Sequence, residues 1–239
     1  MVNGLRKSYE TIIRRIENIA VIDDQYSGVF LVEPFDEYFD FSPRIFIVGR
    51  ETAGWNTDNN KNTIARIQDN IEKNEVSITI NDSLTRYKKH LGDGKGRGFK
   101  RFFSKLAKET GRPKEAREKS ITYANAYAWD FNNKTPQDQP DFKYLETISR
   151  ELLRTQIDYL KPDIIIFAAT ITGLDNYIRK LFPERENLDP FVAKKFWHFK
   201  AEGIDCFRIA HPRSINGEHP KYRELVIDEV KKIIAEKHL

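Results

Sequence analysis

Three short motifs supply an acid, an amide and an imidazole, each at or after an apolar run of the chain. They are Gly49-Arg50-Glu51-Thr52-Ala53, Tyr123-Ala124-Asn125-Ala126 and His211-Pro212-Arg213-Ser214-Ile215. A carboxylate can orient water or stabilise a cation, and an imidazole can donate a hydrogen bond to a developing anion. A carboxamide offers both a donor and an acceptor. Together these groups are candidates for one catalytic or binding site.

Each motif by itself also has a structural interpretation. Glu51 could cap the segment that follows it, because acids are common near helix N-termini. Asn125 could be a turn residue with satisfied hydrogen bonds, and the His-Pro dipeptide occurs again at His219-Pro220. The order of the motifs and their positions at the ends of apolar runs favour a common site.

The elements that must position these motifs alternate along the chain. Apolar runs predict strands at 44–49, 120–129, 163–169 and 203–210. Helical periodicity predicts helices at 8–21, 63–73, 99–110, 142–160, 174–182 and 220–237. This alternation predicts an α/β fold of three α/β/α layers around a central, mainly parallel four-stranded sheet. Ligands bind at the carboxyl ends of such strands, where the three motifs lie.

Length and composition limit the classes of protein. A chain of 239 residues suits one domain over residues 1–239, and its one cysteine excludes an intramolecular disulfide or a four-cysteine metal cluster. We expect neither a metal nor an organic cofactor. The sequence starts without the apolar stretch of a signal peptide and contains no run of about 18 apolar residues. We therefore expect a cytoplasmic protein, with no membrane partner and acting as a monomer.

Positive charge is concentrated in one segment. Residues 86–119 contain 13 Lys and Arg but only 4 Asp and Glu, although the net charge of the whole chain is +4. Such a basic insertion suggests a surface that faces a polyanion, and Lys100 and Arg101 are its candidate DNA contacts. The alternative is a solvated helix face. The glycine-rich stretch 91–98 lacks the Lys-Ser/Thr ending of a phosphate-binding loop and favours a flexible surface loop.

The three motifs, in this order, resemble those of the uracil-DNA glycosylase superfamily. That family has a strand ending in a Gly-Gln-Asp-Pro-Tyr-like motif, a later strand ending in Asn, and a His-Pro-Ser-Pro-Leu-like loop. The resemblance spans residues 44–215 and includes the apolar run around 163–169. It implies a monofunctional DNA glycosylase, which flips a base out of the DNA and hydrolyses its N-glycosidic bond, leaving an abasic site.

The resemblance also implies roles for individual residues. Glu51 matches the acid that activates water, His211 the imidazole that stabilises the departing base, and Asn125 the amide that reads the base edge. The remaining candidates are Trp55 and Arg50 at the base, Arg213 and Ser214 at DNA phosphates, and Ile215 as the apolar wedge in the base stack. Trp55 could equally be a core tryptophan, and Arg50 could form a surface ion pair.

One departure from the family pattern bears on the substrate. Ala53 stands where the family's tyrosine closes the pocket around carbon 5 of uracil, so the pocket has room for a substituent. We expect a pyrimidine modified at carbon 5, such as a hydroxymethylated or glucosylated cytosine of phage DNA, and hence a role in antiviral defence.

Three alternatives to this interpretation stay open. The first is excision of ordinary uracil in DNA repair, and the second is a nucleic-acid-binding module of this fold without catalysis. The third is a metal-dependent nucleotide hydrolase that uses Glu51 and Asp58. The sequence also leaves open whether the DNA partner is duplex or single-stranded.

Overall fold

The computed structural model describes residues 2–20, 25–52, 54–55, 63–92, 98–169 and 173–237. The chain divides into two compact units, each assembled from three segments that are far apart in the sequence. Unit 1 comprises Met1–Glu33, Glu51–His90 and Ala124–Leu160, and unit 2 comprises Pro34–Arg50, Leu91–Tyr123 and Lys161–Leu239. The prediction of one domain over residues 1–239 stays a prediction.

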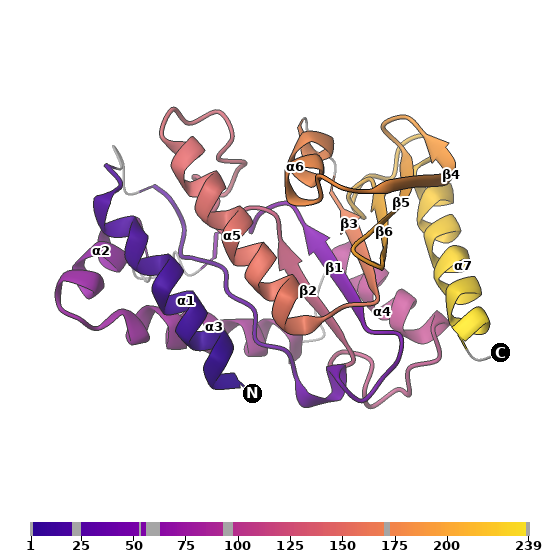
Figure 1. Ribbon diagram of the computed structural model, residues 1–239, viewed down its shortest axis with the longest axis horizontal. Coiled ribbons are helices and arrows are strands. Elements are labelled where there is room, and N and C mark those ends of the chain that lie inside the picture. The colour runs from indigo at the N-terminus through magenta and orange to yellow at the C-terminus, as the bar shows by residue number, and fades with distance from the viewer. Residues whose placement is uncertain are drawn as a thin grey trace. The chain divides into compact units, whose positions relative to one another are not determined.

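Unit 1 is mainly helical (Figure 1). Its helices are α1 (Val2–Ile13), η1 (Arg14–Asn18), α2 (Ile64–Glu72), α3 (Val76–Gly92, whose last two residues belong to unit 2) and α5 (Phe142–Leu160). Helix α1 packs against α5, and Thr63 caps α2 by accepting a hydrogen bond from the backbone N–H of Arg66 at 3.4 Å. The helices predicted at 63–73 and 142–160 are confirmed. Helix α3 was not predicted, because the alternating polar and apolar residues at its start have the period of a strand.

A buried carboxylate, that of Asp130, joins three irregular segments of unit 1. One of its oxygens, Oδ2, accepts hydrogen bonds from Thr52 Oγ1 at 2.8 Å and from the backbone N–H of Gly54 at 2.9 Å. The other, Oδ1, accepts from the backbone N–H of Asn133 at 3.0 Å. The backbone of Asp130 exchanges two further hydrogen bonds with Ser27, each of 3.0 Å. The segment that follows Glu51 is therefore fixed by a side chain about 80 residues away in sequence.

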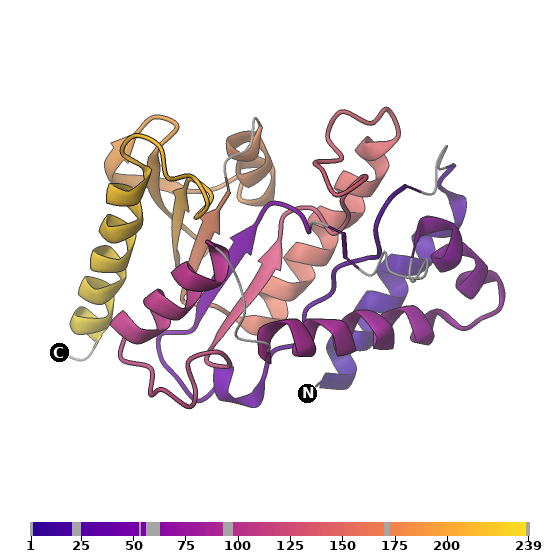
Figure 2. The ribbon, with the colours of Figure 1, turned by 180° about the vertical axis from the view of Figure 1, so that it is seen from behind.

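Unit 2 is built on a mixed six-stranded sheet with the strand order β2-β1-β3-β6-β5-β4 (Figures 1 and 2). The strands are β1 (Ile45–Gly49), β2 (Ile121–Asn125, whose last two residues belong to unit 1), β3 (Ile164–Ala168), β4 (Glu186–Val192), β5 (Phe196–Ala201) and β6 (Ile204–Ile209). Strands β1, β3 and β6 are parallel, with Ile45 opposite Ile164 and Ile164 opposite Asp205. All residues of β1 and β3 are buried, as central parallel strands require.

The predicted α/β class is confirmed, but the sheet is larger and less parallel than the sequence indicated. Strands β4 and β5 pair antiparallel with each other, and β5 pairs antiparallel with β6. The turn between β5 and β6 has positive φ at both Glu202 and Gly203, the geometry of a tight hairpin. Strand β4 gave no signal because most of its residues are exposed and its register shifts between Leu188 and Phe191.

Helices lie on both faces of the β5–β6 part of the sheet. The helices of unit 2 are η2 (Asp36–Tyr38), α4 (Phe99–Glu109), α6 (Leu174–Leu181) and α7 (His219–Lys237). Phe182, which follows α6, contacts Phe199, whereas Tyr222 of α7 contacts Phe196. Residues an odd number apart in a strand point to opposite faces, so α6 and α7 cover different faces. Helix α7 also packs against α4.

Replacing Asp130 with alanine should destabilise the protein. The change leaves the buried hydroxyl of Thr52 and the N–H of Gly54 without their acceptor, at about 1–3 kcal/mol each. We expect the free energy of unfolding in urea to fall by about 3 kcal/mol or more. The exposed Asp138→Ala is the matched control, with an expected change below about 0.5 kcal/mol. Equal effects of the two substitutions would contradict the anchoring role of Asp130.

Candidate functional site

Two of the three motifs meet at one edge of the sheet in unit 2. Arg50 follows the last residue of β1, and His211 follows β6 by two positions. Strand β3 lies between β1 and β6 and is parallel to both. Parallel strands present their carboxyl ends at the same edge, so Arg50 and His211 share the edge at which α/β proteins bind ligands.

Hydrogen bonds within the loop 211–215 fix the orientation of the imidazole. The backbone N–H of Arg213 donates to Nδ1 of His211 at 3.0 Å, and the N–H of Ser214 donates to the His211 carbonyl at 2.8 Å. Arg223 of α7 donates from Nη1 to the carbonyl of Ser214 at 2.7 Å. Because Nδ1 is an acceptor, the neutral ring carries its proton on Nε2.

The surroundings of His211 favour its neutral form. Burial first, and then the charges of Arg213, Arg50 and Arg223, together lower the pKa of its imidazole from 6.5 to about 4. At neutral pH the ring is therefore an uncharged hydrogen-bond donor in a strongly cationic environment.

A glycine allows the start of α4 to approach the loop 211–215. Gly98 has φ of 61°, and a Cβ at this position would lie 2.6 Å from Cγ and 3.3 Å from the backbone nitrogen of Arg213. A side chain at this position would require Arg213 to shift and would be strained by the positive φ. Lys100 and Arg101 follow in the first turn of α4. Arg213 and Ile215 are exposed, Ile215 at 75%. The predicted DNA-contact residues of α4 and of the loop are thus brought together.

In unit 2 an aromatic residue, Phe99, lies beside His211, and a second one, Tyr123, lies beside Phe99. The rings of Phe99 and His211 are 6.2 Å apart and inclined by 36°, and Phe99 contacts Tyr123 at 4.9 Å. Neither ring was predicted from the sequence to belong to the site. Their positions depend on the packing of α4 against the sheet, which no local pattern reveals.

Glu51 and Asn125 belong to unit 1. Glu51 follows Arg50 directly, and its Oε2 atom is buried. Asn125 is the last residue of β2 and is 7% exposed; its Nδ2 has no hydrogen-bond partner among the residues that the structure describes. A buried donor without an acceptor costs about 1–3 kcal/mol. The amide of Asn125 is thus available for an acceptor on a ligand.

The environment of Trp55 favours a role in the core of unit 1. Its side chain is 5% exposed, and its ring lies 4.6 Å from that of Phe30 and 5.7 Å from that of His90. The guanidinium of Arg86 lies 5.4 Å from the ring centre. With its ring packed in this way, Trp55 is less suited to stack on a base than the partly exposed Phe99. Ala53 and residues 93–97 of the glycine-rich stretch lie outside the described residues.

Several cations of the basic segment 86–119 are engaged within the protein. Lys88 pairs with the buried Glu33, Lys105 with Glu224 and Lys119 with Glu37, while Arg112 is buried and donates to the Pro43 carbonyl. The apolar face of α4 is also buried. Lys100 and Arg101 follow Gly98, which contacts the loop 211–215, and they therefore remain candidates for contacts with a polyanion.

No protein-family model matches this sequence, and no curated protein matches it. The resemblance to the uracil-DNA glycosylase superfamily therefore rests on the three motifs. Within the described part of the chain, no group of three or more His, Cys, Asp or Glu side chains is arranged to hold a metal ion. Among the described helices, none is both long and apolar enough to cross a membrane.

The titration of His211 should show its cationic and buried surroundings. We expect a midpoint near pH 4 in NMR, with the His211→Asn variant identifying the signal. Arg213→Ala removes a neighbouring charge and should raise the midpoint toward 6.5, whereas Lys221→Ala, an exposed cation on α7, should not. Between pH 6.5 and 4 the unfolded chain binds a proton that the folded chain does not, so stability should fall as the pH decreases through this range. A wild-type midpoint near 6.5 would exclude this environment.

Proposed function

We propose that the protein is a monofunctional DNA glycosylase of the uracil-DNA glycosylase superfamily, with that family's layered arrangement of helices around its sheet. The enzyme would flip out a pyrimidine and hydrolyse its N-glycosidic bond without a metal or organic cofactor. The observation that supports this most is the neutral His211, with its proton on Nε2, among arginines at the ligand-binding edge of a parallel sheet.

In the proposed reaction His211 stabilises the departing base. Cleavage of the bond between C1′ and the base nitrogen leaves the bonding electron pair on the base, with negative charge shared by its O2 atom. The Nε2–H of His211 donates a hydrogen bond to that oxygen. With a pKa of about 4, only about one ring in a thousand is protonated at pH 7, so the ring acts by hydrogen bonding rather than as a general acid.

Glu51 has the complementary role at the sugar. Loss of the base leaves an oxocarbenium-like sugar, which a carboxylate stabilises electrostatically. The Glu51 carboxylate orients a water molecule and takes its proton as the water oxygen bonds to C1′. The products are an abasic sugar and, after it accepts a proton from solvent, the free base.

Recognition of the flipped base falls to Asn125 and to aromatic side chains. The buried Nδ2 of Asn125 would donate to an acceptor on the pyrimidine edge, while its oxygen accepts from a donor. Phe99, with Tyr123 behind it, suits a stacking surface better than Trp55 does. Arg50 would bind a phosphate or a polar substituent of the base.

The loop 211–215 and the first turn of α4 would hold the DNA. Arg213, Lys100 and Arg101 supply cations for phosphates, and Ser214 supplies a hydroxyl. The exposed Ile215 would enter the gap that the flipped base leaves in the stack.

The proposed substrate is a pyrimidine with a substituent at carbon 5, such as hydroxymethylated or glucosylated cytosine in phage DNA. Support comes from Ala53, a small residue where the family pattern has tyrosine. Enzymes with this specificity would remove bases from modified foreign DNA, which makes antiviral defence the proposed role.

Catalysis should depend on both Glu51 and His211. We expect Glu51→Gln and His211→Ala each to lower the rate of base release by about 10²-fold or more. The measurement is release from oligonucleotides that carry uracil, a thymine mismatch, hydroxymethylcytosine or its glucosylated form, followed by alkaline cleavage at abasic sites. Binding of the substrate DNA should persist in both variants.

Two controls separate the alternatives. Glu72→Gln, an exposed acid, and His219→Ala, in the second His-Pro, should keep full activity. If uracil is the only base released, the substrate is uracil and the role is DNA repair. If the protein binds DNA but releases no base, it is a binding module. Activity that EDTA abolishes would favour a metal-dependent hydrolase, and full activity in Glu51→Gln would rule out the proposed mechanism.

Binding of DNA should be sensitive to salt through Lys100 and Arg101. Replacing both with glutamate removes two phosphate contacts, so the slope of log K against log salt concentration should decrease by about 2. Lys231→Glu/Lys232→Glu makes the same charge change on exposed positions of α7 and is the control. If both double variants alter the slope equally, the first turn of α4 has no special role in DNA binding.

A further inference from the structure

A second site of distinct chemistry lies in unit 2, where a pocket of about 300 Å³ opens between α6 and the β4–β5 hairpin. Its walls include two cations, one acid, two aromatic rings and one amide: Arg179, Arg185, Asp189, Phe191, Trp197 and Asn187. None of these residues belongs to the candidate glycosylase site, so the pocket needs its own explanation.

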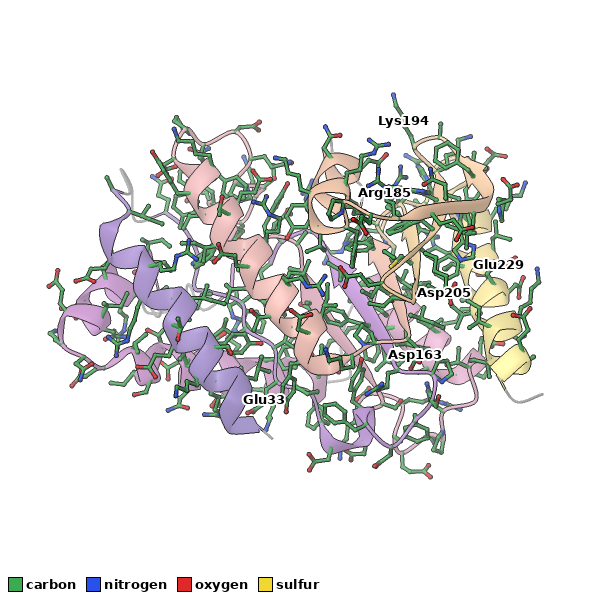
Figure 3. All side chains as sticks on the ribbon, viewed as in Figure 1. Glu33, Asp163, Arg185, Lys194, Asp205 and Glu229 are labelled. Carbon is green, nitrogen blue, oxygen red and sulfur yellow. The ribbon has the colours of Figure 1, made fainter. Side chains whose placement is uncertain are left out.

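The two arginines converge on one ring. The guanidinium carbons of Arg179 and Arg185 lie 5.5 Å and 5.7 Å from the ring centre of Trp197. Arg185, labelled in Figure 3, is fixed by hydrogen bonds from Nη1 to the carbonyls of Phe182 at 2.8 Å and Pro183 at 3.2 Å. Among the described residues neither arginine forms an ion pair, and Nε of Arg185 is buried without a hydrogen-bond partner. Two cations on the wall of one pocket favour an anionic ligand there.

The aromatic side of the pocket is formed by Trp197 and Phe191. Trp197 is buried, packs at 4.5 Å on Phe199 and donates from Nε1 to Oδ1 of Asn187 at 3.0 Å. This bond directs the amide oxygen of Asn187 to the indole and leaves its NH₂ group as a donor. Phe191 lines the same pocket with 55% of its side chain exposed, although it is a large apolar residue. An exposed ring in a pocket with two arginines can stack on a base while the arginines bind a negatively charged group.

We propose that this pocket binds a nucleotide, free or as one unit of a DNA single strand. The base stacks on Phe191, Asn187 donates to an acceptor on its edge, and the phosphate lies between Arg179 and Arg185. The volume is at the lower end of the range for small-molecule pockets, which suits one nucleotide. A cationic ligand is repelled by the arginines, and a neutral sugar leaves both of them without a counter-charge. This inference does not depend on glycosylase activity.

Calorimetric titration of the intact chain with thymidine monophosphate tests the proposal. Arg179→Ala removes an exposed charge and Phe191→Ala an exposed ring, so both variants should fold normally. Each should weaken binding by about tenfold, the loss of one charge-assisted contact or one stacked base. Lys180→Ala, an exposed cation next to Arg179 on α6 that does not line the pocket, and Tyr144→Ala, another exposed ring, are the matched controls.

Further probes separate the possible sources of the ligand. If a short oligothymidylate binds more tightly than the mononucleotide and loses affinity with the same two substitutions, that result assigns the site to a DNA strand. Equal binding of both assigns it to a free nucleotide. The proposal is overturned if inorganic phosphate or methyl glucoside binds as well as the nucleotide, if Lys180→Ala weakens binding as much as Arg179→Ala, or if no probe binds. Such a failure would leave the test of Glu51 and His211 unaffected.

Discussion

Parallel pairing of β1, β3 and β6 is the constraint on which the functional edge of unit 2 depends. Three buried strands that run in the same direction must end at the same edge, so residues about 160 positions apart in sequence become neighbours there. Arg50 and His211 need no direct interaction to share this edge. The tight hairpin at Glu202-Gly203 and the packing of α7 on β6 then hold β6 in register.

The charges around His211 bear on the two roles proposed for the loop 211–215, binding of phosphates and stabilisation of a departing base. Arginines that attract phosphates would ordinarily make a nearby imidazolium costly, and burial adds to that cost. The His211 ring avoids this cost by staying neutral, and its Nδ1 accepts a hydrogen bond from the backbone N–H of Arg213. In the proposed enzyme, cations for DNA and an uncharged hydrogen-bond donor for a departing anion would therefore be compatible in the same loop. A positively charged His211 would compete with the arginines for the same anions, whereas the neutral ring does not.

The sequence predicted those elements whose signals are local. Helix α5 was predicted at its observed bounds because its amphipathic period is unbroken, and β1, β3 and β6 were predicted because they are short buried runs. Strand β4 was missed because an exposed edge strand has no apolar alternation. For the candidate site, the motifs named His211 and Arg50, but the contacts of Phe99 with His211 and of Tyr123 with Phe99 arise from tertiary packing, which no local pattern reveals. The dependence of the segment after Glu51 on Asp130 is a long-range interaction that no local pattern contains.

Strand β4 forms one end of the sheet, and its composition has a consequence for how molecules of this protein meet one another. An exposed sheet edge offers unpaired backbone groups to any other strand. In β4, Pro190 lacks an N–H, the register shift between Leu188 and Phe191 interrupts the ladder, and Glu186 and Asp189 place negative charge on the strand. These features make β4 a poor template for a strand of a second molecule. The same irregular, charged sequence that gave no strand signal for β4 thus disfavours edge-to-edge aggregation.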